Sequence, residues 1–311
     1  MTYDLIFDTA ERVFTDHCSK GLLDSAESGS KDDQRGLFPE GLWTVMQETG
    51  LHRVGCKESG TTLADAFRMI RLAGKFALPL PYPEILMSNR FVRGQGLTTV
   101  AEGVIAPWAR RAERVITDDG RLVDEFDVVQ GVNLAGEPRD EIVFRSSESV
   151  ELPPNFRAIM AMTRVAAMSG AIEKLLELTI GYVGERKQFG RPISRFQAVQ
   201  HSVARMAGEV AASTRASDAA IEALDTDLFV IQVSAAKVRV GEAAGVVAEI
   251  AHQAHGAMGF THEHELHHYT RRLWAWRDEY GHEKEWQQLV GRRVAAAGAD
   301  RAWALISDCA D

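Results

Sequence analysis

The sequence turns on residues 186–197, Arg186-Lys187-Gln188-Phe189-Gly190-Arg191-Pro192-Ile193-Ser194-Arg195-Phe196-Gln197, a polar stretch punctuated by glycine and proline. Apolar residues recur at helical spacing on both sides of it, over residues 160–184 and 196–224. This periodicity predicts two long helices that meet at a corner. Gly190 and Pro192 are expected to end the first helix, because neither residue continues a helix well.

The corner carries groups that suit a flat, phosphate-bearing ligand. The guanidinium of Arg186 can pair with phosphate through two hydrogen bonds, and the ring of Phe189 can stack. The amides of Gln188 and Gln197 can both donate and accept hydrogen bonds. The alternative interpretation is an exposed loop with a solvated arginine. In either case Ser194 is expected to cap the second helix.

Composition limits the functions that need to be considered. The chain has 311 residues, of which 45% are hydrophobic and 25% charged, which is typical of a globular protein with room for two domains. A net charge of −9 argues against a nucleic-acid partner. No apolar run approaches the roughly 20 residues of a membrane span, and no secretory signal is apparent at Met1. The scattered Cys18, Cys56 and Cys309 fit a reducing compartment, so we expect a cytoplasmic protein.

The chain is predicted to be mainly α-helical with a small β domain. Residues 1–95 show helical periodicity in several segments, namely 4–23, a helix initiated by Pro39, 62–76 and 84–91. Residues 96–154 contain short β-branched runs separated by Gly, Asp, Asn and Pro, which predict a small antiparallel β domain. The runs lie at 104–106, 114–116, 122–123, 127–129, 142–144 and 150–152.

Residues 155–311 are predicted to be almost entirely helical. The expected helices cover 157–186, 195–223, 227–257, 263–279 and 283–307. Alanine and other small residues dominate several of them, which permits close packing in a C-terminal four-helix-type bundle.

Two motifs resemble one known family. Residues 186–197 resemble the R-x-Q-F-G-x-P-I-x-x-F-Q signature in the C-terminal helical domain of acyl-CoA dehydrogenases. Gln253-Ala254-His255-Gly256-Ala257-Met258-Gly259-Phe260-Thr261 resembles the Q-x-x-H-G-x-x-G-F-T segment of the same family. The motifs occur in the family's order. The resemblance implies an N-terminal helical domain, a middle β domain and a C-terminal four-helix bundle.

The resemblance also implies an FAD cofactor and the residues that contact it. Arg186 would neutralise the pyrophosphate, and Gln188 with Phe189 would lie against the adenosine half. In the family these residues reach across a dimer interface toward the neighbouring subunit's flavin. The implied cofactor-binding residues are Arg186, Gln188, Phe189, Gln197, Gln253, His255, Gly256 and Gly259.

The family's catalytic base has no clear counterpart. Acyl-CoA dehydrogenation removes an α-proton from a thioester, which requires a carboxylate. Counting along the resemblance puts Tyr280 at the usual glutamate position, with Glu279 and Asp278 just before it as outside candidates. The family's other position for the base falls near Met160, and no acid follows through Ala171. The catalytic residue is therefore left unassigned, and a partner chain is expected to supply it.

Two departures from the family suggest a heteromeric enzyme. The β domain is about half the usual size and lacks a W-I-[TS] flavin-contacting triplet. Trp274-Ala275-Trp276-Arg277-Asp278-Glu279-Tyr280-Gly281 resembles the short subunits of heterotetrameric acyl-CoA dehydrogenases from steroid-degrading actinobacteria. The implied partners are an acyl-CoA substrate, steroid-derived or fatty, a longer homologous subunit, and an electron-transfer flavoprotein or similar acceptor.

Two other functions remain open at this point. His264-Glu265-Leu266-His267-His268 matches H-E-x-x-H, which on a helix sets two imidazoles for zinc and a glutamate for hydrolysis. The same residues also fit the dehydrogenase pattern G-F-T-x-E-x-x-L. A structural or regulatory paralogue without flavin would use Arg186 and Gln253 as ordinary interhelical hydrogen-bonding residues.

Overall fold

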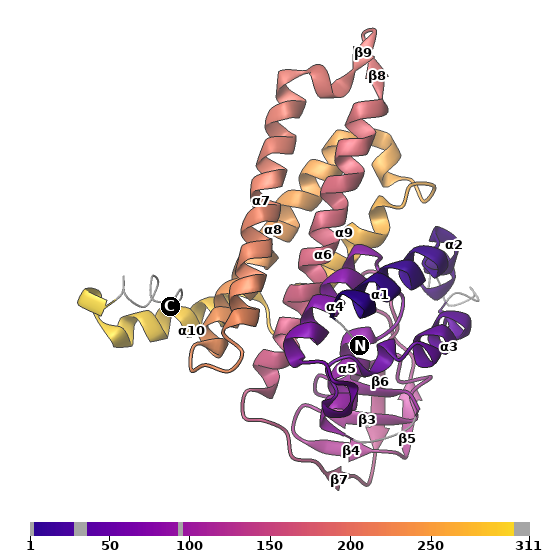
Figure 1. The fold of residues 1–311 in the computed structure, drawn as a ribbon, viewed down its shortest axis with the longest axis vertical. Coiled ribbons are helices and arrows are strands. Elements are labelled where there is room, and N and C mark those ends of the chain that lie inside the picture. The colour runs from indigo at the N-terminus through magenta and orange to yellow at the C-terminus, as the bar shows by residue number, and fades with distance from the viewer. Residues whose placement is uncertain (1–2, 28–35, 93–95, 302–311) are drawn as a thin grey trace. The chain divides into compact units, whose positions relative to one another are not determined.

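The computed structural model describes residues 3–27, 36–92 and 96–301. The chain divides into two compact units, residues 1–163 and 164–311 (Figure 1). Cys309 and the predicted end of the last helix near residue 307 lie outside the described residues. None of the helices in those three stretches combines the length and apolar character that a membrane span requires.

The helices of the first unit lie near the predicted segments. They are α1 (Tyr3–His17), α2 (Lys20–Ala26), α3 (Glu40–Glu48), α4 (Leu63–Lys75) and α5 (Tyr82–Phe91). The prediction of one helix over 4–23 was wrong, because Ser19 caps a new helix by accepting a hydrogen bond from the Leu22 N–H. Thr62 and Asp65 form a reciprocal capping box that fixes the start of α4.

The β region contains two small sheets. The strands are β1 (Thr98–Ala101), β2 (Ile105–Pro107), β3 (Arg114–Thr117), β4 (Arg121–Val123), β5 (Phe126–Val129), β6 (Arg139–Phe144) and β7 (Glu148–Ser149). They pair in the orders β1-β3-β4-β7 and β2-β6-β5. The expectation of purely antiparallel pairing was wrong, because β1 and β3 are parallel. The last predicted run was also misplaced: the strand ends at Ser149, before residues 150–152.

A buried ion pair fixes the turn that follows β2. Asp140 on β6 is fully buried and receives two kinds of hydrogen bond from Arg110, one from its guanidinium at 2.5 Å and one from its backbone N–H at 2.9 Å. A buried carboxylate needs such partners, because its desolvation is otherwise unfavourable. The small β core, which includes Ala106, Val115 and Ile142, lies beside this pair in the sequence and shares β6 with it.

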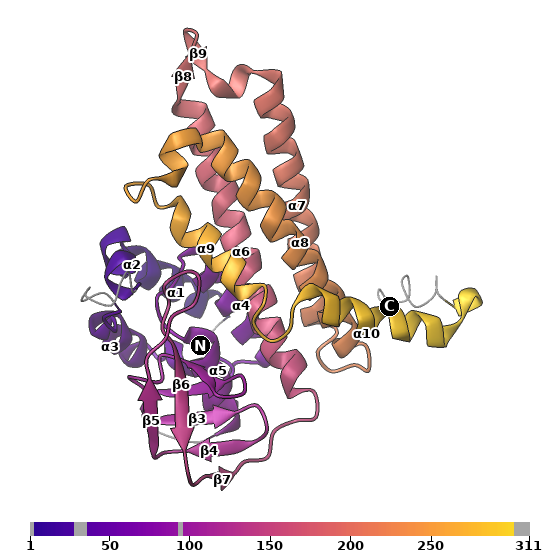
Figure 2. The same cartoon turned by 180° about the vertical axis from the view of Figure 1, so that it is seen from behind.

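The second unit is helical. The helix α6 (Phe156–Glu185) runs into it from the first unit, and α7 (Gln197–Glu222), α8 (Phe229–His255), α9 (Leu266–Trp276) and α10 (Glu283–Ala297) follow. The three long helices α6, α7 and α8 lie side by side in both views (Figure 2). The interior of α8 is rich in buried alanine, which permits close approach to α7. The mainly helical fold was therefore predicted correctly.

A buried lysine holds the loop between α9 and α10. Lys237 of α8 donates hydrogen bonds to the backbone carbonyls of Arg277 at 2.6 Å and Gly281 at 2.8 Å. Burial lowers the pKa of Lys237 to about 8, and the nearby carboxylate of Glu283 partly offsets that effect. The indole of Trp286 donates to the carbonyl of Tyr280 at 3.2 Å. Side chains from two helices therefore fix the backbone of this loop.

We expect the substitution Lys237→Met to destabilise the protein by about 2–4 kcal/mol, because two buried carbonyls would lose their donor. The free energy of unfolding from urea titrations measures the effect. The matched control is Lys174→Met on α6, whose partly exposed ammonium lies 3.9 Å from Glu177, and which should change stability by less than about 0.5 kcal/mol. Equal effects of the two substitutions would contradict the role given to Lys237.

Candidate functional site

A tight β-hairpin replaces the simple corner expected between α6 and α7. Strands β8 (Lys187–Gln188) and β9 (Arg191–Pro192) pair around Phe189 and Gly190. These two residues have positive φ values of 50° and 78°, as a two-residue type I′ turn requires. The turn points the Phe189 side chain outward, where 91% of it is exposed.

The start of α7 differs from the prediction. A short 3₁₀ turn, Ile193–Arg195, follows the hairpin, and the residue at the N-cap is Phe196, which makes no side-chain capping bond. The predicted Ser194 cap was therefore wrong, because Ser194 lies inside the 3₁₀ turn. The Ile193 N–H donates to the Arg186 carbonyl at 2.8 Å, which closes the base of the hairpin.

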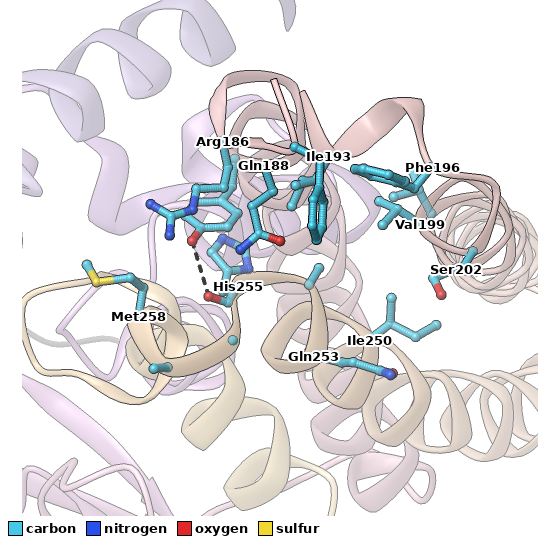
Figure 3. A pocket seen from close by; sticks show the side chains of 17 residues that line it. Arg186, Gln188, Ile193, Phe196, Val199, Ser202, Ile250, Gln253, His255 and Met258 are labelled. Carbon is cyan, nitrogen blue, oxygen red and sulfur yellow. Dashed lines mark hydrogen bonds between the residues drawn. The ribbon is translucent and has the colours of Figure 1, made fainter. Parts of the chain in front are cut away.

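The hairpin forms one side of a pocket in the second unit. The pocket has a volume of about 540 Å³ and lies among the end of α6, the hairpin, the start of α7, the end of α8 and the 3₁₀ turn Gly256–Phe260. Figure 3 shows Arg186 and Gln188 on one side, with His255, Gln253 and Met258 on the other. The pocket thus combines one guanidinium, two amides and several aromatic rings.

Most of the predicted cofactor residues meet in this pocket, although more than sixty positions separate the two motifs. Six of the eight line it: Arg186, Gln188, Phe189, Gln253, His255 and Gly256. Gln197 is exposed at the start of α7 and does not line it. Gly259 does not line it either. A Cβ at Gly259 would lie 2.9 Å from the His255 Cβ, so its role in the structure is close packing.

The pocket borders a basic surface in an acidic protein. Residues 186–208 contain five basic side chains and no Asp or Glu, namely Arg186, Lys187, Arg191, Arg195 and Arg205. All five are exposed, and none forms an ion pair within the stretches that the structure describes. Arg191 instead packs over the Phe196 ring at 4.4 Å. The surface is therefore suited to an anionic ligand.

Tyr182 is a pocket residue that the sequence motifs did not identify. Its ring stacks on His255 with centroids 4.4 Å apart, and its hydroxyl donates to the His255 carbonyl at 3.2 Å. Tyr182 precedes Arg186 by four residues on the same helix, so the two share a face. That spacing was the signal available in the sequence.

Two histidines anchor the turn that lines the pocket. The His252 ring stacks on Phe260 at 4.6 Å, and its Nε2 lies 3.1 Å from the Thr270 hydroxyl on α9. His255 packs on Tyr182 of α6. Burial lowers the pKa of His252 and of His255 below the ordinary value of 6.5, so the folded protein favours their neutral forms.

The candidate base residues sit in a structural cluster. Glu279 accepts a hydrogen bond from the Arg164 guanidinium at 2.5 Å, with side chains only 17% and 3% exposed. Tyr280 is buried, has a positive φ of 56°, and lies under the same guanidinium at 5.1 Å. Asp278 is exposed, and Met160 on α6 is fully buried. The loop geometry thus commits the Glu279 carboxylate to Arg164.

The zinc alternative requires two histidines on one helix turn, which the structure does not have. The helix α9 begins at Leu266, after His264. The Nδ1 of His264 accepts a hydrogen bond from the Leu266 N–H at 3.1 Å. Among the residues described, His264 and His268 do not share a cluster of metal-ligating atoms. The H-E-x-x-H match therefore lacks the geometry that gives the motif its meaning.

The lowered pKa values of His252 and His255 predict a loss of stability in acid. Below pH about 6.5 the unfolded chain binds more protons at these sites than the folded chain, so the free energy of unfolding should fall with pH; above that value the contribution is fully present. Urea titrations at pH 7.5 and 5.5 measure the change. His255→Phe should reduce the difference between the two pH values, whereas the exposed His201→Gln should not. An unaltered difference in His255→Phe would contradict the assignment.

Comparison with known proteins agrees with this geometry. The family description "Acyl-CoA dehydrogenase, C-terminal domain" matches residues 157–279. The acyl-CoA dehydrogenase IpdE2 of Mycolicibacterium smegmatis is 32% identical over 296 residues, which cover 86% of this chain and 91% of that protein.

Solved structures share the fold. The ChsE4-ChsE5 complex from Mycobacterium tuberculosis contains a chain that matches with a TM-score of 0.82 and 19% identity, covering 96% of this chain and 98% of that one. The Tcur3481-Tcur3483 steroid ACAD matches with a TM-score of 0.79 and 19% identity, covering 95% and 98%. The IpdE2 match extends over nearly the whole chain, and the predicted family is thereby confirmed: the chain belongs to the acyl-CoA dehydrogenase family.

Proposed function

We propose that this chain is one subunit of an FAD-dependent acyl-CoA dehydrogenase that introduces a double bond between the α and β carbons of a CoA thioester. The observation that carries the proposal is the pocket, in which a guanidinium, two amides and aromatic rings converge from two separate motifs. An accidental surface hollow would have no reason to gather this set of groups.

The residues present fit the adenosine and pyrophosphate parts of FAD. The exposed guanidinium of Arg186 would pair with the pyrophosphate. The amides of Gln188 and Gln253 would hydrogen-bond to the adenine or ribose. Gly256 has a positive φ of 58°, and no side chain there limits the approach of a ligand to the backbone. Bound FAD supplies the hydride-accepting flavin ring.

The pocket is one half of a site, and we propose that a second chain completes it. Phe189 is 91% exposed, Phe260 is 73% exposed and Met258 is 42% exposed. Exposed aromatic and methionine side chains beside arginines are typical of protein interfaces. The partner would be a longer homologous subunit in a heterotetramer, and the two-protein ChsE4-ChsE5 complex offers a precedent for this fold.

We propose that the partner also supplies the catalytic base. In this chain Glu279 is paired with Arg164 at 2.5 Å, so its carboxylate has a structural neighbour rather than an open approach to a substrate. The tyrosine at position 280 is buried and cannot replace a carboxylate at neutral pH, because its phenol holds its proton. The role of this chain is then to bind the dinucleotide and assemble the enzyme.

For the substrate we propose a steroid-derived acyl-CoA, with an electron-transfer flavoprotein or a similar protein as the electron acceptor. The Trp274–Gly281 segment resembles steroid-degrading heteromeric enzymes, and the Tcur3481-Tcur3483 structure is described as a steroid ACAD. A panel of CoA thioesters that includes steroid and straight-chain acyl groups distinguishes this proposal from fatty acyl-CoA oxidation.

The substitution Arg186→Gln tests the dinucleotide site. Loss of a charge-assisted contact to phosphate should weaken FAD binding by about 10- to 100-fold, measured by flavin fluorescence on the complex formed with the longer subunit. The control is Arg215→Gln, an exposed arginine that pairs with Glu222 at 2.8 Å away from the pocket. Unchanged flavin affinity in Arg186→Gln would favour a flavin-free structural paralogue.

The division of labour is tested by assaying the chain with and without its partner. Purified alone, in the presence of FAD and an artificial electron acceptor, the chain should turn over CoA thioesters at least about 100-fold more slowly than the co-expressed pair, because general-base catalysis would be missing. Equal turnover by the isolated chain would show that it holds its own base. Circular dichroism of the isolated chain controls for folding.

A further inference from the structure

One buried polar atom of the pocket wall has no partner in the protein. The side chain of His255 is part of a residue that is only 3% exposed, and its Nδ1 lies 2.7 Å from the carbonyl of Ala251. A carbonyl can only accept, so Nδ1 carries the proton and the neutral ring leaves Nε2 as a bare acceptor. Within the described parts of the chain, no group hydrogen-bonds to this Nε2.

The surroundings keep the ring from turning toward water. Its face stacks on Tyr182 at 4.4 Å with an interplanar angle of 27°, and the His264 ring meets it edge-on at 4.6 Å. The Tyr182 hydroxyl also holds the backbone of His255. Burial lowers the pKa of His255, which keeps Nε2 in its acceptor form at neutral pH. The orientation of the ring is therefore set before any ligand binds.

An acceptor left unsatisfied in this way is unfavourable by about 1–3 kcal/mol, so a fixed one in a pocket wall requires an explanation. The two ring nitrogens lie on opposite edges of the imidazole, and Nδ1 faces the backbone of α8. Nε2 is consequently turned away from that helix. His255 shares the pocket with Arg186 and Gln253, and a nucleotide that enters it carries hydroxyl and amino donors.

We propose that Nε2 of His255 accepts a hydrogen bond from the nucleoside part of the bound dinucleotide, through either a ribose hydroxyl or the exocyclic amine of the base. His255 is then a specificity-determining residue: its side chain selects nucleotides that offer a donor, in addition to the backbone contact that the family motif implies. This inference rests on the proposed dinucleotide site and identifies what the side chain of that site reads.

Calorimetric binding of ADP and three analogues to the 311-residue chain tests the proposal. Inosine diphosphate lacks the exocyclic amine, and 2′-deoxy-ADP and 3′-deoxy-ADP each lack one hydroxyl. On the wild-type chain, one analogue should bind about tenfold more weakly than ADP, which corresponds to one hydrogen bond. His255→Phe retains a stacking ring but no acceptor, and on it ADP and that same analogue should bind equally. His255→Gln retains an acceptor and should restore the difference.

The outcomes separate the two levels of the argument. If each analogue loses the same factor on the wild type and on His255→Phe, His255 reads no donor and the inference is overturned, while the dinucleotide site stands. If ADP does not bind the wild-type chain or its complex, the proposed function itself fails. Should His255→Phe not fold, histidine-selective ¹⁵N labelling of the wild type decides. The Nε2 resonance of His255 should shift with ADP and stay in place with the analogue that lacks the donor; identical shifts with all four ligands would refute the proposal.

Discussion

The two-residue turn at Phe189 and Gly190 is the constraint from which the candidate site follows. Both residues adopt positive φ, so the chain reverses within two residues and the Ile193 N–H returns to the Arg186 carbonyl. The end of α6 and the start of α7 are thereby held side by side, and Arg186 and Gln188 face the end of α8. A corner without this hairpin would leave the guanidinium and amide without a fixed direction.

Binding groups and catalytic groups have different fates in this chain. The pocket keeps unpaired cations and free amides, which suit a ligand that comes from outside. The loop at the family's base position is instead tied down by Lys237, Trp286 and Arg164. Its polar groups are consumed by internal contacts, which stabilise the fold but leave no carboxylate poised for proton transfer. This contrast is the physical basis for a subunit that binds a cofactor and relies on a partner for the base.

The sequence predicted what depends on local pattern and missed what depends on distant contacts. Helices α6, α7 and α8 were recovered within two residues, because long apolar periodicity dominates their formation. The strand Thr98–Ala101 was not predicted, since its pairing with β3 spans a separate strand and turn. Gln197 belongs to the motif yet does not line the pocket, because helical geometry, not sequence proximity, decides which side chains share a face. The unpartnered Nε2 of His255 could be seen only in three dimensions.

The most direct test of this account is an experimental structure of the FAD-loaded complex of this chain with its longer partner. The account predicts the pyrophosphate against the Arg186 guanidinium, the adenosine between Gln188 and Gln253, and the flavin ring extending into the partner. Flavin bound elsewhere, with Arg186 and Gln253 pointing into bulk water, would contradict it.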